Sequence, residues 1–264
     1  MDIVTKKLST IQVIPMIKDI DKRYIDELVK VCNEYNIPVI EDAAESLGSR
    51  YKGQKCGSFG DFGILSFNGN KMITTSGGGA LVTKNLEYKK KAVFLATQAR
   101  DDAPHYQHSH VGYNYRMSNV LAGIGRGQME VLDDRVRARR ANFEFYKASL
   151  GHFSQIEFVK EPEGYFSNRW LSCILTPSFE IRENIRLALL KDDVESRPLW
   201  KPMHQQPIFE KHPQYIDGTS DQLFHEYSCI ALYGIGTGLT YRLATSVILL
   251  RFGEANLAKR YTGL

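Results

Sequence analysis

The sequence of 264 residues has few cysteines and no long apolar run. Its four cysteines are far apart and form no C-x-x-C pair, so neither a disulfide framework nor a zinc site is indicated. The first fifteen residues lack the apolar stretch of a signal peptide. The most apolar late segment, residues 243–252, is much shorter than the roughly 20 residues that span a bilayer. These absences predict a cytoplasmic protein with no membrane partner.

The sequence also lacks a large excess of positive or of negative charge. The 34 Lys and Arg residues nearly balance the 30 Asp and Glu residues, which leaves a formal net charge of +4. A charge this small over the whole chain predicts no nucleic-acid partner. The densest basic run follows a helical apolar pattern and is interpreted as a solvated helix face. It consists of Arg135, Arg137, Arg139 and Arg140.

The order of the apolar segments predicts an α/β fold. A strand at 11–16, a helix at 21–36 and a strand at 37–42 are typical of a parallel crossover. Strands at 62–67 and 79–83 follow, and then a helix at 85–96. The spacing of apolar residues predicts that one face of the helix at 21–36 is buried. That face consists of Tyr24, Ile25, Leu28, Cys32 and Tyr35.

A long helical pattern at 118–150 precedes a stretch of short strands with Pro and Gly between them. We therefore predict two domains, residues 1–152 and 153–264, the second with a helix at 181–193. The predicted buried face of the long helix consists of Val120, Leu121, Ile124, Met129, Val131 and Leu132.

Asp42 and Lys71 are the first candidates for chemistry. Asp42 ends a predicted parallel strand, where open α/β sheets bind ligands, although a carboxylate there is also a common cap. Lys71 lies in "GNKMITTSGGG", between two predicted strands, and is either an ordinary exposed lysine or a nucleophile. Ser66 precedes this loop. The run Gly77–Gly79 either brings backbone N–H groups close to an anion or forms a flexible turn. The spacing is not that of a Walker loop.

The sequence contains two further polar clusters. The histidines at 105, 108 and 110 have no carboxylate or cysteine to complete a metal site, so we expect no metal. The segment "GYNYRMSN" begins the long helix with Ser118 as its N-cap, which leaves Asn114 and Arg116 without a structural role. No G-x-G-x-x-G follows a predicted strand, which argues against a nicotinamide-dependent oxidoreductase.

Together these segments resemble the DegT/DnrJ/StrS family of sugar-nucleotide aminotransferases, fold type I enzymes that depend on pyridoxal phosphate. The resemblance rests on residues 39–83, 112–125 and 197–209. The motifs "SFNGNKMITTSGGG", "SNRWLS" and "RPLWKPMH" are most similar to enzymes that aminate UDP-linked 4-keto-6-deoxy-N-acetylhexosamines. The resemblance implies a partial cofactor-binding large domain, mainly a parallel sheet with helices, and a smaller α+β C-terminal domain.

The resemblance also implies a role for each candidate residue. Asp42 matches the aspartate that pairs with the pyridine nitrogen, and Glu45 falls where relatives place a side chain near the ring hydroxyl. Ser66 matches the hydroxyl that binds the cofactor phosphate, and Lys71 matches the Schiff-base lysine. Asn114 matches an amide that reaches the cofactor of the neighbouring subunit, which implies a homodimer. A nucleotide sugar and glutamate are the implied substrates.

The family has a longer N-terminal part, which holds a phosphate-binding turn at a helix N-terminus and an aromatic residue that stacks on the cofactor ring. The resemblance therefore implies an N-terminally truncated chain. Two functions from different classes follow. The chain is either an aminotransferase, completed by another polypeptide, or an impaired remnant that binds cofactor or anions, or associates with an intact homologue.

Overall fold

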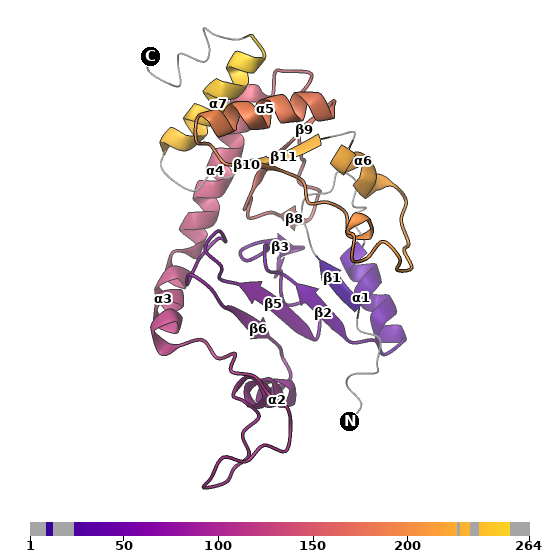
Figure 1. Cartoon of the computed structure of the whole chain (residues 1–264), viewed down its shortest axis with the longest axis vertical. Helices are drawn as coiled ribbons and strands as arrows, with labels where there is room; N and C mark the ends of the chain where they lie inside the picture. Colours follow the sequence, from indigo (N-terminus) through magenta and orange to yellow (C-terminus); the bar gives the residue numbers. More distant parts are fainter. Residues whose placement is uncertain (1–8, 13–23, 226–227, 233–237, 254–264) are drawn as a thin grey trace. The chain divides into compact units, whose positions relative to one another are not determined.

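The computed structural model describes residues 9–12, 24–225, 228–232 and 238–253 (Figure 1). The chain divides into two compact units. The first takes its residues from Met1–Val136 and Glu161–Trp170, and the second from Arg137–Lys160 and Leu171–Leu264. The chain thus changes unit inside a helix and returns to the first unit for one short segment. The predicted division after residue 152 stays a prediction.

The first unit is built on a mixed sheet. Its described strands, in spatial order, are β1 (Ser9–Gln12), β2 (Val39–Asp42), β5 (Phe62–Ser66) and β6 (Gly79–Val82). β1, β2 and β5 run parallel, whereas β6 pairs antiparallel with β5. Helix α1 (Tyr24–Glu34) connects β1 to β2, so the predicted parallel crossover is confirmed.

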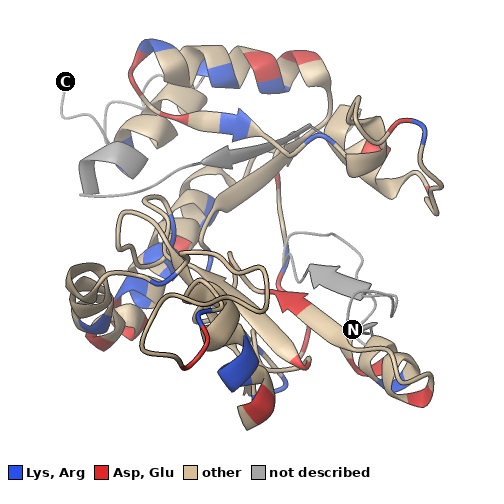
Figure 2. Ribbon diagram, turned by 60° about the horizontal axis from the view of Figure 1, so that its bottom comes forward, with Lys and Arg blue, Asp and Glu red and all other residues tan. Residues whose placement is uncertain are grey.

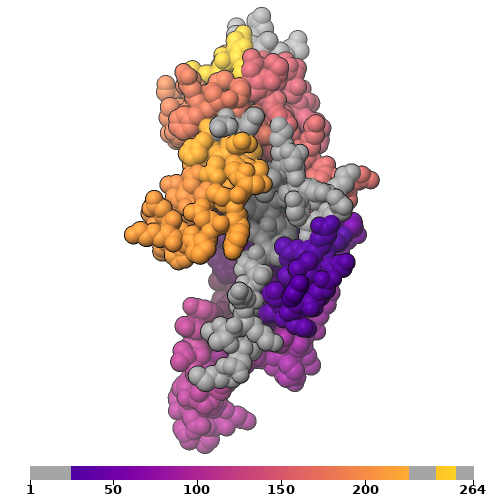
Figure 3. All heavy atoms as spheres, turned by 90° about the vertical axis from the view of Figure 1, so that its right-hand side faces the viewer, coloured from indigo at the N-terminus to yellow at the C-terminus, as the bar shows by residue number. Residues whose placement is uncertain are grey.

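The burial of α1 differs from the prediction. Ile25 and Cys32 are buried, but Leu28 is exposed and Tyr35 has an exposed fraction of 72%. The predicted face was therefore wrong for these two residues. Figure 3 shows α1, in indigo, at the molecular surface.

A small second sheet brings the returning segment into the first unit. Its strands, in order, are β4 (Gln54–Lys55), β3 (Arg50–Tyr51) and β8 (Tyr165–Phe166), all antiparallel. Tyr51 is almost fully buried, and its ring lies 4.5 Å from that of Tyr165 between centroids. This packing fixes Glu161–Trp170 beside the loop that follows β2.

The first two helices after β6 each begin directly after a residue whose side chain caps the helix. α2 (Leu86–Ala96) begins at Asn85, whose side chain accepts hydrogen bonds from two backbone N–H groups. The predicted long helix is two helices, α3 (Asn119–Glu130) and α4 (Leu132–Leu150), because Val131 leaves the helical conformation and caps α3. Ser118 caps α3 as predicted, with Oγ accepting from Leu121 N–H at 3.3 Å.

The exposed faces of α3 and α4 also differ from the prediction. Val120 has an exposed fraction of 74%, and Ile124 and Met129 are exposed, so the predicted buried face was wrong for all three. In the basic run at the start of α4, Arg135 and Arg137 are exposed, whereas its last two arginines are half-buried. The solvated-face interpretation is therefore confirmed only in part.

The second unit is an antiparallel sheet with helices. Its described strands, in spatial order, are β10 (Ser196–Pro198), β11 (Ser228–Leu232), β9 (Ser172–Thr176) and β7 (Glu157–Phe158). The helices are α5 (Phe179–Lys191), α6 (Thr219–His225), α7 (Gly238–Arg251) and the 3₁₀ turn η1 (Met203–Gln205). β9 is buried at every position, as suits the middle of a covered sheet.

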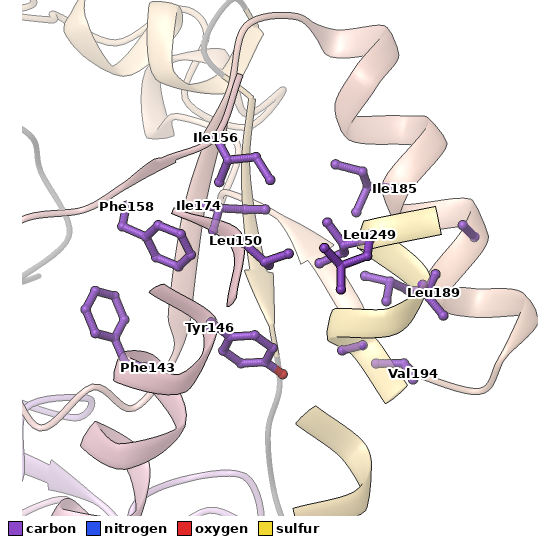
Figure 4. Packing of buried hydrophobic residues seen from close by; sticks show 14 residues of the cluster. Phe143, Tyr146, Leu150, Ile156, Phe158, Ile174, Ile185, Leu189, Val194 and Leu249 are labelled. Atoms are coloured by element: carbon purple, nitrogen blue, oxygen red, sulfur yellow. The ribbon is translucent and has the colours of Figure 1, made fainter. Parts of the chain in front are cut away.

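One apolar cluster forms the core of this unit (Figure 4). It takes Phe143, Tyr146 and Leu150 from α4, Ile174 from β9, and further aliphatic residues from α5 and α7. α5 carries residues of both charge signs (Figure 2). No helix among the described residues is long and apolar enough to cross a bilayer.

Candidate active site

Lys71 lies in the loop between β5 and β6. The backbone of Phe67 forms hydrogen bonds with two residues near the other end of this loop. Phe67 N–H donates to the Gly78 carbonyl at 3.0 Å, and the Phe67 carbonyl accepts from Thr75 N–H at 3.0 Å. Within the loop, Lys71 N–H donates to the Asn68 carbonyl at 3.1 Å. Met72 and Ile73 are buried directly after the lysine, so they anchor the loop on that side of it.

The three consecutive glycines at the end of this loop are not equivalent. Gly78 has a φ of +86°, a conformation that favours glycine. A Cβ on Gly79 would lie 2.3 Å from the Leu65 carbonyl oxygen, whereas a Cβ on Gly77 would meet nothing within 4 Å. The run therefore returns the chain tightly into β6, and the flexible-turn interpretation holds for Gly77 at most.

The amine of Lys71 is held by two side chains from other segments. Its Nζ donates to Glu45 Oε1 at 3.1 Å, and it lies 4.2 Å from the centre of the Trp170 ring. The side chain of Lys71 is only 13% exposed, which is low for a lysine. The ordinary exposed lysine that the sequence left open is therefore wrong.

Asp42 and Ser66 lie at the same end of the sheet. Asp42 is in register with Ile64 on the parallel strand β5, and Ser66 follows two residues later. Both therefore lie at the carboxyl ends of neighbouring parallel strands, where open α/β sheets bind ligands. Asp42 Oδ1 accepts from Ala44 N–H at 3.1 Å, so it also caps the turn.

The neighbouring carboxylate, Glu41, has a different role. It is 1% exposed, and its two oxygens accept from the N–H groups of Gly57 at 2.5 Å and Phe59 at 2.9 Å. Burial, together with the charge of Glu41, raises the pKa of Cys56 to about 12. This thiol therefore stays protonated and is no nucleophile.

Two functional candidates were missed in the sequence, Asn168 and Trp170. Asn168 Nδ2 donates to the carbonyls of Glu45 at 2.8 Å and Leu47 at 3.0 Å. Trp170 Nε1 donates to the Asn70 carbonyl at 2.6 Å, and its backbone N–H donates to Asn168 Oδ1 at 2.9 Å. The motif "SNRWLS" was a signal of resemblance, but nothing in its spacing placed it beside Lys71.

Among the described residues, no hydrogen bond joins Asn114 to Lys71. It forms an antiparallel bridge with Thr97, after the end of α2, and its side chain is exposed. The three histidines of residues 105–110 are used within their own loop; His108 Nδ1, for example, lies 2.9 Å from the Gln98 carbonyl. Across the described part of the chain, no group of three or more His, Cys, Asp or Glu residues could hold a metal ion.

The donor set fits pyridoxal phosphate. Lys71 offers an amine for the aldehyde, and Asp42 offers a carboxylate for the protonated ring nitrogen. Ser66 Oγ accepts from Asn68 N–H at 3.3 Å, so its own hydroxyl proton is left to donate to a phosphate. An amine, an acid and a hydroxyl at one sheet end match three groups of this cofactor, namely its aldehyde, its ring nitrogen and its phosphate.

Comparisons with known sequences give the chain a family. Residues 21–237 match the profile of the DegT/DnrJ/EryC1/StrS aminotransferase family. EpsN of Bacillus subtilis (strain 168), which is named as a pyridoxal phosphate-dependent aminotransferase, is 53% identical over 186 residues, covering 70% of this chain and 48% of that protein. GDP-perosamine synthase of Escherichia coli O157:H7 is 37% identical over 193 residues, covering 72% of this chain and 52% of that protein.

A third relative is named for a different nucleotide sugar. It is the UDP-4-amino-4,6-dideoxy-N-acetyl-beta-L-altrosamine transaminase of Campylobacter jejuni subsp. jejuni serotype O:23/36 (strain 81-176), 32% identical over 191 residues, covering 71% of this chain and 51% of that protein. The chain thus spans about half the length of the curated relatives it matches.

Solved structures confirm the fold type I prediction. The aminotransferase TlmJ from Streptoalloteichus hindustanus matches with a TM-score of 0.81 at 20% identity, covering 94% of this chain and 66% of that one. The PLP-form of Spr1654 from Streptococcus pneumoniae matches with a TM-score of 0.77 at 21% identity, covering 97% and 69%. Since the family profile extends over residues 21–237, this chain belongs to the DegT/DnrJ/EryC1/StrS aminotransferase family, whose members depend on pyridoxal phosphate.

Proposed function

We propose that this chain is the catalytic polypeptide of a sugar-nucleotide aminotransferase, with Lys71 as the residue that attaches pyridoxal phosphate. The amino donor would be glutamate and the acceptor a UDP-linked 4-keto-6-deoxy sugar. The observation that carries the proposal is the environment of Lys71. Its amine is shielded from solvent and contacts Glu45 and Trp170. The loop that carries Lys71 follows strand β5, which ends at Ser66.

The residues divide the work by their chemistry. When bound, the cofactor supplies an electron sink for the carbanion formed at the amine carbon. Asp42 would keep the ring nitrogen protonated, and Ser66 would donate a hydrogen bond to the phosphate. Lys71 would first hold the cofactor and, once released from it, move a proton between the two carbons that exchange nitrogen. Glu45, whose carboxylate contacts Nζ at 3.1 Å, would orient the amine.

The identity of the sugar nucleotide rests on the motifs rather than on geometry. The relatives include a synthase named for GDP-perosamine and a transaminase named for a UDP sugar. We propose the UDP-linked sugar because "SFNGNKMITTSGGG", "SNRWLS" and "RPLWKPMH" favour that group. A purified chain supplied with glutamate and either UDP- or GDP-linked 4-keto-6-deoxy sugar would decide between them by the mass of the aminated product.

The site is proposed to be completed from outside this chain segment. Ser66 and Asn114 offer two side-chain donors to a phosphate, with Asn114 serving the neighbouring subunit of a homodimer. The matched regions make up about half of each of these two relatives. A chain that binds cofactor weakly, or acts only with another polypeptide, is the second candidate function, because two side-chain donors leave part of a phosphate unpaired.

Cofactor attachment tests the proposal most directly. Pyridoxal phosphate is mixed with the purified protein, the product is reduced with borohydride, and peptide mass mapping locates the label. We expect the label at Lys71, and the variant Lys71→Arg should lose it while keeping its fold by circular dichroism. Lys52, an exposed lysine of the same unit, serves as the internal control. Label spread evenly over the exposed lysines would contradict the proposal.

A further inference from the structure

Trp170 reaches the lysine from a segment 99 positions later in the chain, which makes the contact a product of the fold rather than of local sequence. The side chain is 5% exposed and makes two contacts at once. Its ring faces Lys71 Nζ at 4.2 Å, and its Nε1–H donates to the carbonyl of Asn70, the residue before the lysine. One indole therefore contacts both the amine and the backbone next to it.

The backbone around Trp170 is arranged for this contact. Asn168 is 1% exposed, and its amide binds the carbonyls of Glu45 and Leu47. Arg169 has a φ of +51°, in the left-handed region that a non-glycine residue rarely adopts. This turn allows the side chain of Asn168 and the backbone N–H of Trp170 to meet at 2.9 Å. The same tetrapeptide, Ser167–Trp170, thus contacts the loop of Glu45 and the loop of Lys71.

We propose that Trp170 is the positioning residue for Lys71, held in place by Asn168. The indole face and the Glu45 carboxylate bracket the amine, and the Nε1–H bond fixes the backbone that carries it. An aromatic face attracts an ammonium group, and tryptophan does so most strongly. The inference rests on the proposed function only for the purpose of the contacts, since the contacts themselves are made by this chain's own residues.

Two reagents separate positioning from general loosening. Formaldehyde with cyanoborohydride methylates accessible amines without recognising a phosphate or a ring. Pyridoxal phosphate followed by borohydride labels Lys71 only if the amine is correctly placed. Both are applied to the wild type, Trp170→Phe and Trp170→Leu, and label at Lys71 is measured as a ratio to label at Lys52. Lys52 is a matched control because its Nζ lies over the ring of Tyr51, 5.1 Å from the centre.

The expected signature is a change of opposite sign in the two reactions. In Trp170→Leu, methylation of Lys71 should rise about fivefold relative to Lys52, because the amine loses its aromatic cover. Labelling by pyridoxal phosphate at Lys71 should fall by a similar factor. Trp170→Phe keeps a ring but loses the Nε1–H donor. Its labelling of Lys71 in both reactions should therefore lie between that of the wild type and that of Trp170→Leu. A role confined to stability would move both reactions in the same direction and alter Lys52 as well.

Each result bears on the inference. Unchanged methylation of Lys71 in Trp170→Leu, or a fall in both reactions, would overturn it. If Trp170→Leu shows no cooperative unfolding transition, Trp170→Phe decides alone, and equality with the wild type in both reactions overturns the inference. If the wild type takes no selective pyridoxal phosphate label, the proposed function fails, and the methylation ratio still tests the contact between Trp170 and Lys71.

Discussion

Glu41 and Asp42 are adjacent carboxylates with different surroundings. Successive side chains of a strand point to opposite faces, so Glu41 enters the interior while Asp42 lies at the edge of the candidate site. Glu41 satisfies two backbone N–H groups, those of Gly57 and Phe59. We infer that Glu41 supports the fold and that Asp42 serves the cofactor.

Substitution by the matching amides separates these roles. Glu41→Gln places an NH₂ group against a backbone donor and should lower the free energy of unfolding by about 1–3 kcal/mol. Asp42→Asn keeps an oxygen for Ala44 N–H and should stay within about 0.5 kcal/mol of the wild type, while pyridoxal phosphate labelling of Lys71 falls. Urea denaturation measures the first effect. An equal loss of stability in both variants would show that Asp42 is structural too.

For single residues, the sequence predicted which side chains belong to the candidate site better than it predicted the contacts that those side chains make. The sequence indicated Asp42 at the end of a strand as a candidate, but that Glu41 rather than Asp42 is the buried carboxylate depends on the pleat of the strand. Glu45 and Lys71 were both named from the resemblance, yet their 3.1 Å contact was not. Trp170 was missed because a contact across 99 positions leaves no trace in local periodicity.

Among the elements, the loop from Phe67 to Gly79 contributes most to the site. Its end is crowded, since a Cβ at Gly79 would lie 2.3 Å from the Leu65 carbonyl in the paired strand, whereas Gly77 has open space around it. Backbone cannot move aside as the far end of a flexible side chain can. The β5–β6 pairing and the position of Lys71 therefore depend on glycine at 79.

The variants Gly79→Ala and Gly77→Ala form a matched pair two residues apart. Gly79→Ala should destabilise the protein by about 1–3 kcal/mol and reduce the pyridoxal phosphate label at Lys71, because β6 must shift away from β5. Gly77→Ala should leave both close to the wild type. Thermal unfolding and labelling are measured side by side. Comparable losses from the two substitutions would mean that flexibility, rather than close packing, is what the glycines provide.

The elements themselves were largely predictable. Strand β2 ends at Asp42 as the apolar run indicated, and Ser118 begins α3 as an N-cap. The break between α3 and α4 at Val131 was not predicted, because no Pro or Gly lies within two residues of it. The exposure of Val120 and Ile124 was not predictable either. Periodicity identifies an apolar face, but not which surface covers it.

At the scale of the whole molecule, the exposed apolar residues of α3 and of the segment before it indicate how the protein assembles. Val120 and Ile124 of α3 are exposed, and so are Tyr113 and Tyr115 in the segment just before it, whose rings stack 5.0 Å apart. Exposed apolar groups of this kind mark interaction surfaces. Asn114 lies between the two tyrosines, so a second copy seated here would bring its own Asn114 into the same interface.

We therefore expect the protein to be a dimer at micromolar concentration, through the segment that begins α3. The double variant Val120→Asp/Ile124→Asp should shift it to a monomer in light scattering, because a closed two-fold interface repeats each buried charge on both copies. Tyr35→Asp is the control, since Tyr35 is 72% exposed on a different element and should leave the dimer intact. Labelling of Lys71 should fall in the double variant although Asp42, Ser66 and Lys71 are unchanged, because the partner's Asn114 would no longer reach the phosphate. A wild-type monomer would contradict the expected dimer, and a monomeric variant with undiminished labelling would show that labelling of Lys71 does not need the neighbouring subunit.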